Sequence, residues 1–108
     1  MLLPVKKLPK TAMELFEMLP EGLNCEVIHN KLYMSPAPLF EHQDVSDELT
    51  SQIRSFVKSK KSGRCVSAPI DVFLDGSNAF QPDIIFIATE NLGIIVKGKV
   101  RGTPDIVI

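Results

Sequence analysis

The sequence has few cysteines, no long hydrophobic run and no excess of charge of one sign, and each absence excludes a class of protein. Its 108 residues include two cysteines, Cys25 and Cys65, without the paired spacing of a zinc site. No segment approaches the roughly 20 apolar residues that span a bilayer, so we expect no membrane partner. The formal net charge of −1 argues against a histone-like protein with a global basic field.

The remaining composition is that of an ordinary globular domain. The hydrophobic content is 44%, and no linker, repeat or low-complexity tract divides the chain. The start, MLLPVKKLPK, lacks the apolar core of a secretory signal. We therefore predict a cytoplasmic protein with two buried free thiols. We assign residues 1–108 to a single domain, with residues 1–10 as an extended arm.

The first half of the chain predicts a short helix followed by a β-hairpin. Thr11 and Glu14 match a capping box, in which each side chain accepts a backbone N–H at the start of a helix. Pro20 ends that helix. Residues 25–36, CEVIHNKLYMSP, then alternate as two strands around a turn that contains Asn30.

Residues 41–63 predict a long amphipathic helix. Acids crowd its start and bases its end, which complements the helix dipole, and Gly63 is the predicted stop. One face is apolar at helical spacing, through Val45, Leu49, Ile53, Phe56 and Val57.

The second half predicts strands. Residues 64–75 and 80–88 are strand candidates joined by a turn at 75–78, and residues 93–108 predict a strand, a basic glycine-rich connection and a final strand. The run Ile84–Ile87 is nearly all apolar, which is typical of a strand in the middle of a covered sheet.

Asp83 is the first candidate for chemistry, because it follows Pro82 directly before that apolar strand. A carboxylate in such a place stays ionised when a cation or several donors face it. It is therefore either a ligand for a hard divalent cation such as Mg²⁺ or a polar cap at the start of the strand.

Other polar residues have two interpretations as well. Asp105 repeats the Pro-Asp context, and the two acids either meet at one sheet edge or never meet. Asp71 and Glu26 lie within strand patterns, as solvent-facing residues or as further acids of a site. His42, near the start of the long helix, is interpreted as a cap or surface residue.

Two local basic groups are compatible with phosphate contacts, which depend on local and not on net charge. They are otherwise simply solvated surfaces. The larger group contains Arg54, Lys58, Lys60, Lys61 and Arg64, and the smaller contains Lys97, Lys99 and Arg101.

An ordered series of motifs carries a resemblance to a known family. The segments are TAMELFEMLP at 11–20, CEVIHNKLYMSP at 25–36, His42, APIDVFL at 68–74, QPDIIFI at 81–87 and RGTPDIVI at 101–108. In this order and spacing the chain resembles the restriction-endonuclease family of uncharacterised proteins within the PD-(D/E)XK nuclease superfamily. One departure is the hairpin turn, His29-Asn30, where family members usually have Asp-Gly.

The resemblance implies both a fold and a site. The fold is an α/β (α+β mixed-sheet) restriction-endonuclease-like core: an N-terminal helix, a β-hairpin, a long helix, then three to four strands. The activity implied is that of a Mg²⁺-dependent DNA endonuclease, and Asp83 is the residue that would hold the metal in its site. Glu26 matches a frequent family acid and joins Asp83 as a catalytic candidate, while Lys97, Lys99 and Arg101 are the candidate phosphate contacts.

The resemblance also implies missing parts. The family's glutamate and lysine follow the strand that begins at the second Pro-Asp, which places both beyond Ile108. We therefore expect a C-terminally truncated domain that binds Mg²⁺ weakly and is inactive in this form. The alternative is a non-catalytic binding module. The apolar final strand is an edge strand that favours a homodimer in either case.

Overall fold

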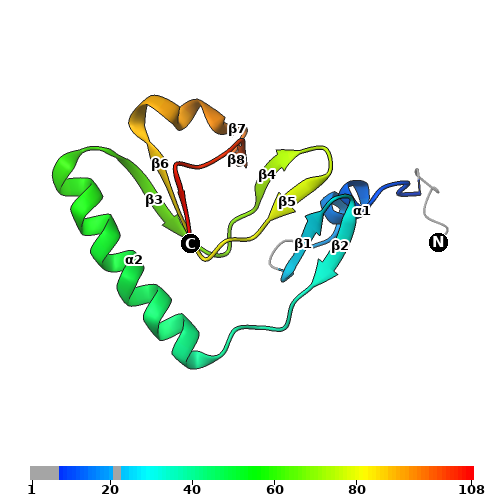
Figure 1. Ribbon diagram of the computed structural model, residues 1–108, viewed down its shortest axis with the longest axis horizontal. Helices are drawn as coiled ribbons and strands as arrows, with labels where there is room; N and C mark the ends of the chain where they lie inside the picture. The colour runs from blue at the N-terminus through cyan, green and yellow to red at the C-terminus, as the bar shows by residue number, and fades with distance from the viewer. Residues whose placement is uncertain (1–7, 21–22) are drawn as a thin grey trace, which may run out of the picture.

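The structure is a computed structural model that describes residues 8–20 and 23–108. Most of the predicted arm, residues 1–7, lies outside the described residues, and residues 8–10 have no regular secondary structure. Figure 1 shows α1 and the first hairpin at one end of the molecule, α2 along the other side, and the C-terminus between them.

The short helix α1, Ala12–Met18, begins where the capping pattern predicts. The Glu14 N–H donates to Thr11 Oγ1 over 3.1 Å, and the Lys10 N–H donates to Glu14 Oε2 over 2.7 Å. Both side chains therefore accept a backbone N–H, as expected of residues at a helix start. The helix buries Phe16 against Phe73, with ring centroids 5.7 Å apart in an edge-to-face arrangement.

The hairpin pairs β1, Cys25–Ile28, with β2, Lys31–Met34. Its turn residues His29 and Asn30 both have positive φ, 48° and 60°. Two such residues match the twist of the strands, and asparagine adopts this conformation readily. The departure from Asp-Gly therefore leaves the hairpin intact. Cys25 in β1 is a buried free thiol, as is Cys65.

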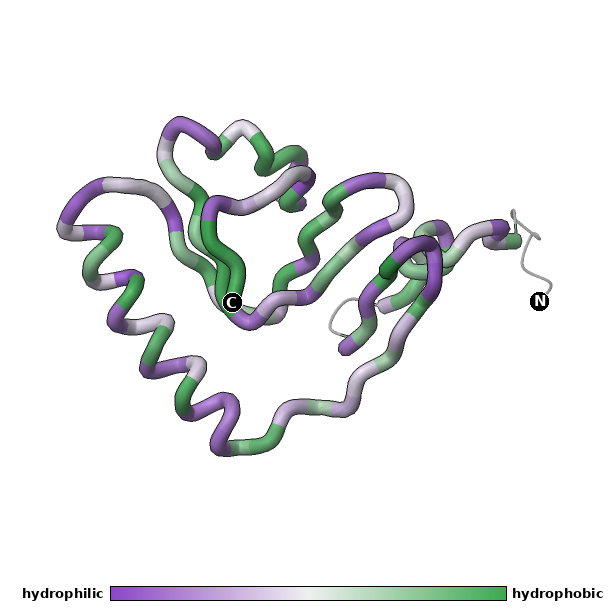
Figure 2. Tube along the Cα trace, in the orientation of Figure 1, coloured by the Kyte–Doolittle hydropathy of each residue, from purple (hydrophilic) through white to green (hydrophobic). Residues whose placement is uncertain are grey.

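The long helix α2, Phe40–Lys60, ends earlier than predicted. Lys61 takes the left-handed conformation at φ 51°, and Gly63 is already the first residue of a strand. The apolar face is only partly covered: Val57 is buried, whereas Phe56 is 62% exposed. Figure 2 shows hydrophobic and hydrophilic residues alternating along this helix.

The chain after α2 has more strands than the three or four predicted, because both long strand candidates split. Residues 64–75 divide where Pro69 cannot donate to a ladder, and residues 80–88 divide at Pro82. The basic connection after β7 also contains a strand. The elements are β3 Gly63–Ser67, β4 Val72–Asp75, β5 Asn78–Phe80, β6 Ile84–Ala88, the 3₁₀ helix η1 Thr89–Ile94, β7 Ile95–Val96, β8 Lys99–Arg101 and β9 Ile106–Val107.

These strands form two sheets, and the mixed α/β class is confirmed. One sheet has the order β2-β1-β5-β4-β8-β7, with a parallel pair between β4 and β8. The other has the order β3-β6-β9 and is antiparallel. The former strand candidate 64–75 thus contributes to both sheets, which local sequence does not reveal.

Strand β6 lies in the middle of the smaller sheet, as its apolar sequence predicts. Ile84 packs with Val57 of α2 and with Cys65. Ile85 and Ile87 point to the other face, where they pack with β4 and β8, because side chains alternate along a strand. The helix α2 therefore covers one face of the sheet, and the larger sheet covers the other.

The helices of the described ranges, 8–20 and 23–108, include none with the length and apolar character needed to cross a membrane.

Candidate functional site

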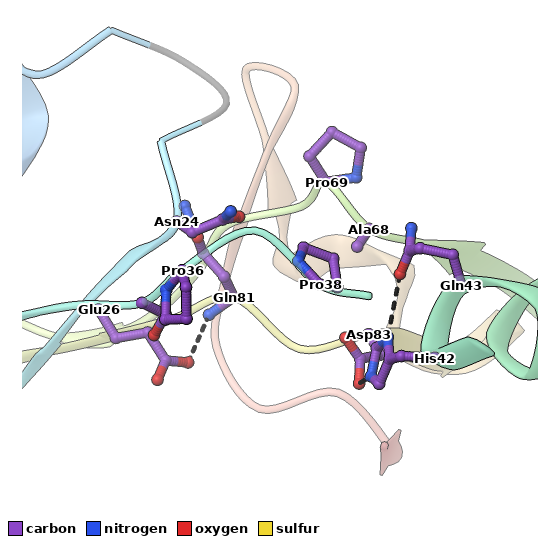
Figure 3. A pocket seen from close by; sticks show the side chains of 11 residues that line it. Asn24, Glu26, Pro36, Pro38, His42, Gln43, Ala68, Pro69, Gln81 and Asp83 are labelled. Carbon is purple, nitrogen blue, oxygen red and sulfur yellow. Dashed lines mark hydrogen bonds and ion pairs between the residues drawn. The ribbon is translucent and has the colours of Figure 1, made fainter. Parts of the chain in front are cut away.

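A cleft of about 380 Å³ opens between the first hairpin, the start of α2 and the entrance to β6. Its walls come from segments far apart in the sequence: Asn24, Glu26, Ser35, Pro36, Pro38, His42, Gln43, Ala68, Pro69, Gln81 and Asp83. Figure 3 shows these side chains, with two acids among them. Both acids were candidates from the sequence, so the fold brings Asp83 and Glu26 to one cleft.

Asp83 enters the cleft from the bend directly before β6. Its backbone N–H donates to the Ile108 carbonyl over 2.7 Å, which fixes the bend against β9. Its side chain is 44% exposed, and Oδ2 lies 3.0 Å from His42 Nε2. The carboxylate is thus held directly before the buried strand β6, and part of its side chain is accessible to solvent.

His42 is the partner that sequence reasoning did not assign to Asp83. It lies in the first turn of α2, with Nδ1 3.0 Å from Gln43 Oε1 and Nε2 facing Asp83. The hydrogen bond with Gln43, followed by the hydrogen bond and charge of Asp83, raises the pKa of His42. His42 and Asp83 are 41 residues apart, and the only sequence signal was the histidine in the family-like series.

Glu26 lines the same cleft but does not join Asp83. Its Oε2 accepts the Gln81 N–H over 2.9 Å. In Figure 3 the Glu26 carboxylate and the His42–Asp83 pair lie on opposite sides of the pocket. Glu26 therefore ties β1 to the segment before β6, and its contacts are those of a positioning residue.

Gln81 is a second residue that sequence reasoning missed. Its Oε1 accepts the Cys25 N–H, and its Nε2 donates to the Leu23 carbonyl and to Asp71 Oδ1 over 2.7 and 2.8 Å. Asp71 is thus half-buried and hydrogen-bonded, so it is not the solvent-facing residue that was one of its two interpretations. Gln81 stands two residues before Asp83, so this network fixes the chain that leads into the site.

Asp105 does not meet Asp83. Strands β6 and β9 are antiparallel, so the two Pro-Asp bends lie at opposite ends of the pair. Asp105 accepts the Ala88 N–H and the Asn91 side-chain amide over 2.7 and 2.8 Å. The other end of β9 lies beside Asp83, because the Ile108 N–H donates to the Ile84 carbonyl. Strand β9 therefore runs from Asp105 toward Asp83.

The candidate phosphate contacts lie outside the cleft. Lys97 is a turn residue with φ 51°, between β7 and β8. Lys99 Nζ and Arg101 Cζ lie over the Phe73 ring, 5.4 and 4.6 Å from its centroid. None of the three lines the cleft that contains Asp83. They are therefore not positioned to contact a phosphate group bound beside that carboxylate.

The donor set around Asp83 is small for a metal centre. Within residues 8–20 and 23–108, no group of three or more His, Cys, Asp or Glu side chains is arranged to hold a metal ion. A cation at Asp83 would therefore depend on water or substrate oxygens for most of its ligands, as Mg²⁺ commonly does.

Comparison with known proteins gives a family and a fold. The sequence model of the Uma2 family, "Putative restriction endonuclease", matches residues 12–108. Among solved structures, a crystal structure from Anabaena variabilis ATCC 29413, described as "a putative nuclease belonging to DUF820", matches with a TM-score of 0.68 and 22% identity. The match covers 88% of this chain and 53% of that chain, so this chain spans about half the length of its structural neighbour.

A comparison with curated proteins finds no match. The family match covers all but the first residues of the chain, and the matched segment holds the His42–Asp83 pair and the cleft. The Anabaena variabilis structure shares the fold. The chain therefore belongs to the Uma2 family of restriction-endonuclease-like proteins.

Proposed function

We propose that this chain forms the metal-binding half of a DNA endonuclease site, which hydrolyses phosphodiesters with a divalent cation such as Mg²⁺. One observation carries the proposal. Asp83 presents a half-exposed carboxylate into a cleft from the rigid start of β6, a strand whose Ile85 is fully buried. A carboxylate fixed on a rigid element is the kind of group that positions a metal for phosphoryl chemistry.

The residues present fit such a cation in part. Asp83 offers an oxygen ligand of the type that Mg²⁺ prefers, and the cleft of about 380 Å³ has room for water and a phosphate group. When bound, the cation would polarise the phosphate and acidify a water molecule. The chain itself would bind and orient: Asp83 would hold the cation, and Glu26 with Gln81 would fix the approach of the segment before β6.

Binding of DNA would use basic residues away from the cleft. Lys99 and Arg101 are held by contacts with the Phe73 ring, and Lys97 lies in the adjacent turn. Placed outside the cleft, these side chains suit phosphates that flank the scissile one, since backbone contacts position DNA without reading its sequence. Replacing all three with alanine would weaken DNA binding and flatten its salt dependence.

We propose further that the described residues alone cleave DNA poorly, because a single carboxylate holds Mg²⁺ weakly. The test is plasmid nicking with Mg²⁺ or Mn²⁺. It compares this chain with a chimera in which residues 12–108 replace the matching half of the Anabaena variabilis protein. The chimera is expected to nick, and Asp83→Ala to abolish its nicking.

Asp105→Ala in the same chimera is the matched control. The Asp105 carboxylate accepts hydrogen bonds from Ala88 and Asn91 and does not line the cleft. Nicking that survives Asp83→Ala contradicts the assignment of Asp83. If this chain without the added half instead nicks efficiently and loses that activity with Asp83→Ala, the result contradicts only the proposal that residues 12–108 alone cleave DNA poorly.

A second candidate function, a homodimerising module, is favoured by a separate surface. An apolar groove of about 610 Å³ runs between α2 and the β6–β9 edge, with Phe56, Ile106 and Ile108 among its lining residues. These side chains are exposed, and β9 is the outer strand of its sheet, which is a template for pairing with another chain.

Light scattering after size-exclusion chromatography tests this candidate. A dimer at micromolar concentration that becomes a monomer with Ile106→Lys supports it, and Val45→Lys, an exposed apolar residue outside the groove, is the control. A monomer for the unaltered chain excludes it.

A further inference from the structure

We propose that His42 is a second protein ligand of the cation at Asp83, and that the pair makes the site select Mn²⁺ or Co²⁺ over Mg²⁺. The inference rests on the proposed function, because it needs a cation at Asp83. It adds a ligand from α2 and a prediction of which metal the site prefers.

The spacing of the two side chains is that of neighbouring ligands on one cation. His42 Nε2 and Asp83 Oδ2 are 3.0 Å apart. Two ligands at right angles around an octahedral cation, each about 2.1 Å from it, lie about 3.0 Å from one another. Two ligands of a tetrahedral cation at a similar radius lie about 3.4 Å apart. The observed distance therefore matches that between two adjacent ligands of an octahedral cation.

The hydrogen-bond partners of the imidazole leave Nε2 directed at the Asp83 carboxylate. Gln43 Oε1 and Asp83 Oδ2 each lie 3.0 Å from a different ring nitrogen of His42. A neutral imidazole has one N–H. In the imidazolium both ring nitrogens donate, one to Gln43 and one to Asp83. In the neutral ring whose Nδ1–H donates to Gln43, the lone pair of Nε2 faces the Asp83 carboxylate, and a metal cation can take the place of the proton. Gln43 thus sets the tautomer that presents Nε2 as a metal ligand.

Both side chains come from rigid elements and face a shared open space. His42 is in the first turn of the 21-residue helix α2, and Asp83 directly precedes β6. The helix packs on the sheet that contains β6 through Val57 and Ile84. Since the two side chains are 45% and 44% exposed, water or a phosphate oxygen can complete the coordination.

The ligand types decide the metal. Carboxylate and water suit Mg²⁺, whereas an imidazole nitrogen adds affinity for transition metals such as Mn²⁺ and Co²⁺. Mg²⁺ is bound through oxygen and gains little from His42. The preference for Mn²⁺ over Mg²⁺ should therefore depend on His42, while binding of either ion should depend on Asp83.

The experiment titrates the purified chain with Mn²⁺ alone, following the free-ion EPR signal, and then displaces the Mn²⁺ with Mg²⁺. His42→Gln is expected to weaken Mn²⁺ binding by about tenfold or more and to leave Mg²⁺ binding within about twofold. Electron spin-echo modulation from a bound imidazole nitrogen is expected in the unaltered chain and absent in His42→Gln. His29→Gln, at the other of the two histidines, is the control.

The outcomes separate this inference from the proposed function. If Asp83→Asn abolishes Mn²⁺ binding while His42→Gln and His29→Gln bind equally well and the nitrogen modulation is missing, only this inference fails. If Mn²⁺ does not bind at millimolar concentration, this inference fails and the proposed function is still decided by nicking in the chimera; if Mn²⁺ binds and neither Asp83→Asn nor His42→Gln changes that binding, both fail. Far-UV circular dichroism establishes that each variant is folded, and His42→Asn repeats the test with a shorter amide.

Discussion

Asp83 and Asp105 have the same local setting and opposite surroundings. Each follows a proline, each lies in a bend, and each directly precedes a strand, β6 or β9. Asp83 faces a cleft and contacts a side chain of α2. Asp105 accepts two hydrogen bonds from Ala88 and Asn91 near the end of β6. The Asp83 carboxylate lines a cleft, whereas the Asp105 carboxylate is exposed and accepts hydrogen bonds from its own chain.

The antiparallel register explains this difference. Since Ile85 pairs with Val107 and Phe86 with Ile106, the start of each strand lies beside the end of the other. The start of β9 meets the turn into η1, which supplies N–H donors for Asp105. The start of β6 lies beside Ile108 at the end of β9, and the first turn of α2 brings His42 to it. The surroundings of the same Pro-Asp sequence therefore depend on which segments of the chain pack beside it.

The largest expected effect is a difference in folding stability between truncations in β6, which is buried, and in β9, which is exposed. Ile85 is 0% exposed between the two sheets, and its cross-strand partner Val107 is 55% exposed. Ile85→Ala is expected to lower the free energy of unfolding by about 2–5 kcal/mol, because it leaves a cavity in the core. Val107→Ala is expected to lower it by about 0.5 kcal/mol or less. Urea denaturation measures both, and equal losses would contradict the asymmetry.

The next effect concerns the residue two places before each acid. Gln81 makes side-chain hydrogen bonds to β1 and Asp71, whereas Thr103 is exposed. Gln81→Ala leaves the Cys25 N–H and Asp71 without these partners, and we expect a loss of about 1–3 kcal/mol. Thr103→Ala is the matched control, with an expected loss within about 0.5 kcal/mol. A comparable loss for both variants in thermal unfolding would show that the Gln81 network contributes little.

The two acids themselves give the third comparison. Asp105→Ala removes the acceptor for Ala88 N–H and the Asn91 amide, and it is expected to cost about 1–2 kcal/mol. Asp83→Ala breaks one half-exposed pair with His42 and is expected to cost about 0.5 kcal/mol or less. Chemical denaturation without metal ions measures the two values. A larger loss for Asp83→Ala would contradict the expectation that Asp105 contributes more to folding stability than Asp83.

Much of the fold could be predicted because its signals are local. Thr11 and Glu14 act within one turn of α1, His29-Asn30 closes a turn of adjacent strands, and the apolar run of β6 marks a buried strand wherever it pairs. The splitting of residues 64–75 was not predicted, although Pro69 is a local signal for it, because the strand-like composition of both halves favoured one continuous strand. Their assignment to different sheets depends on partners distant in the sequence.

The site was predicted in part for the same reason. Asp83 carries its own local signature, a proline before it and a buried strand after it. His42 reaches Asp83 only because α2 packs on the smaller sheet, and Gln81 reaches β1 only through pairing of β5 with β1. The candidate acid could thus be identified from sequence, whereas the residues that contact it or fix the segment before it required the tertiary structure.

The smallest expected effect is a pH dependence that belongs to Asp83 and not to Asp105. The hydrogen bond with Gln43, followed by the contact with Asp83, raises the pKa of His42 above its ordinary value of 6.5 in the folded chain. A group whose pKa is raised on folding stabilises the fold fully below its unfolded pKa. The contribution is then lost as pH rises through the folded pKa. The stabilising contribution of His42 should therefore be present below about pH 6.5 and disappear above the raised pKa.

NMR titration of the His42 ring in metal-free buffer measures the pKa directly. Asp83→Asn should lower the pKa of His42, because it removes the negative charge that favours the imidazolium. The Gln43 contact should keep part of the increase. Asp105→Asn should leave the pKa of His42 unchanged, since Asp105 lies at the other end of the strand pair. An equal decrease in both variants would mean that general charge, and not the 3.0 Å contact, sets the protonation of His42.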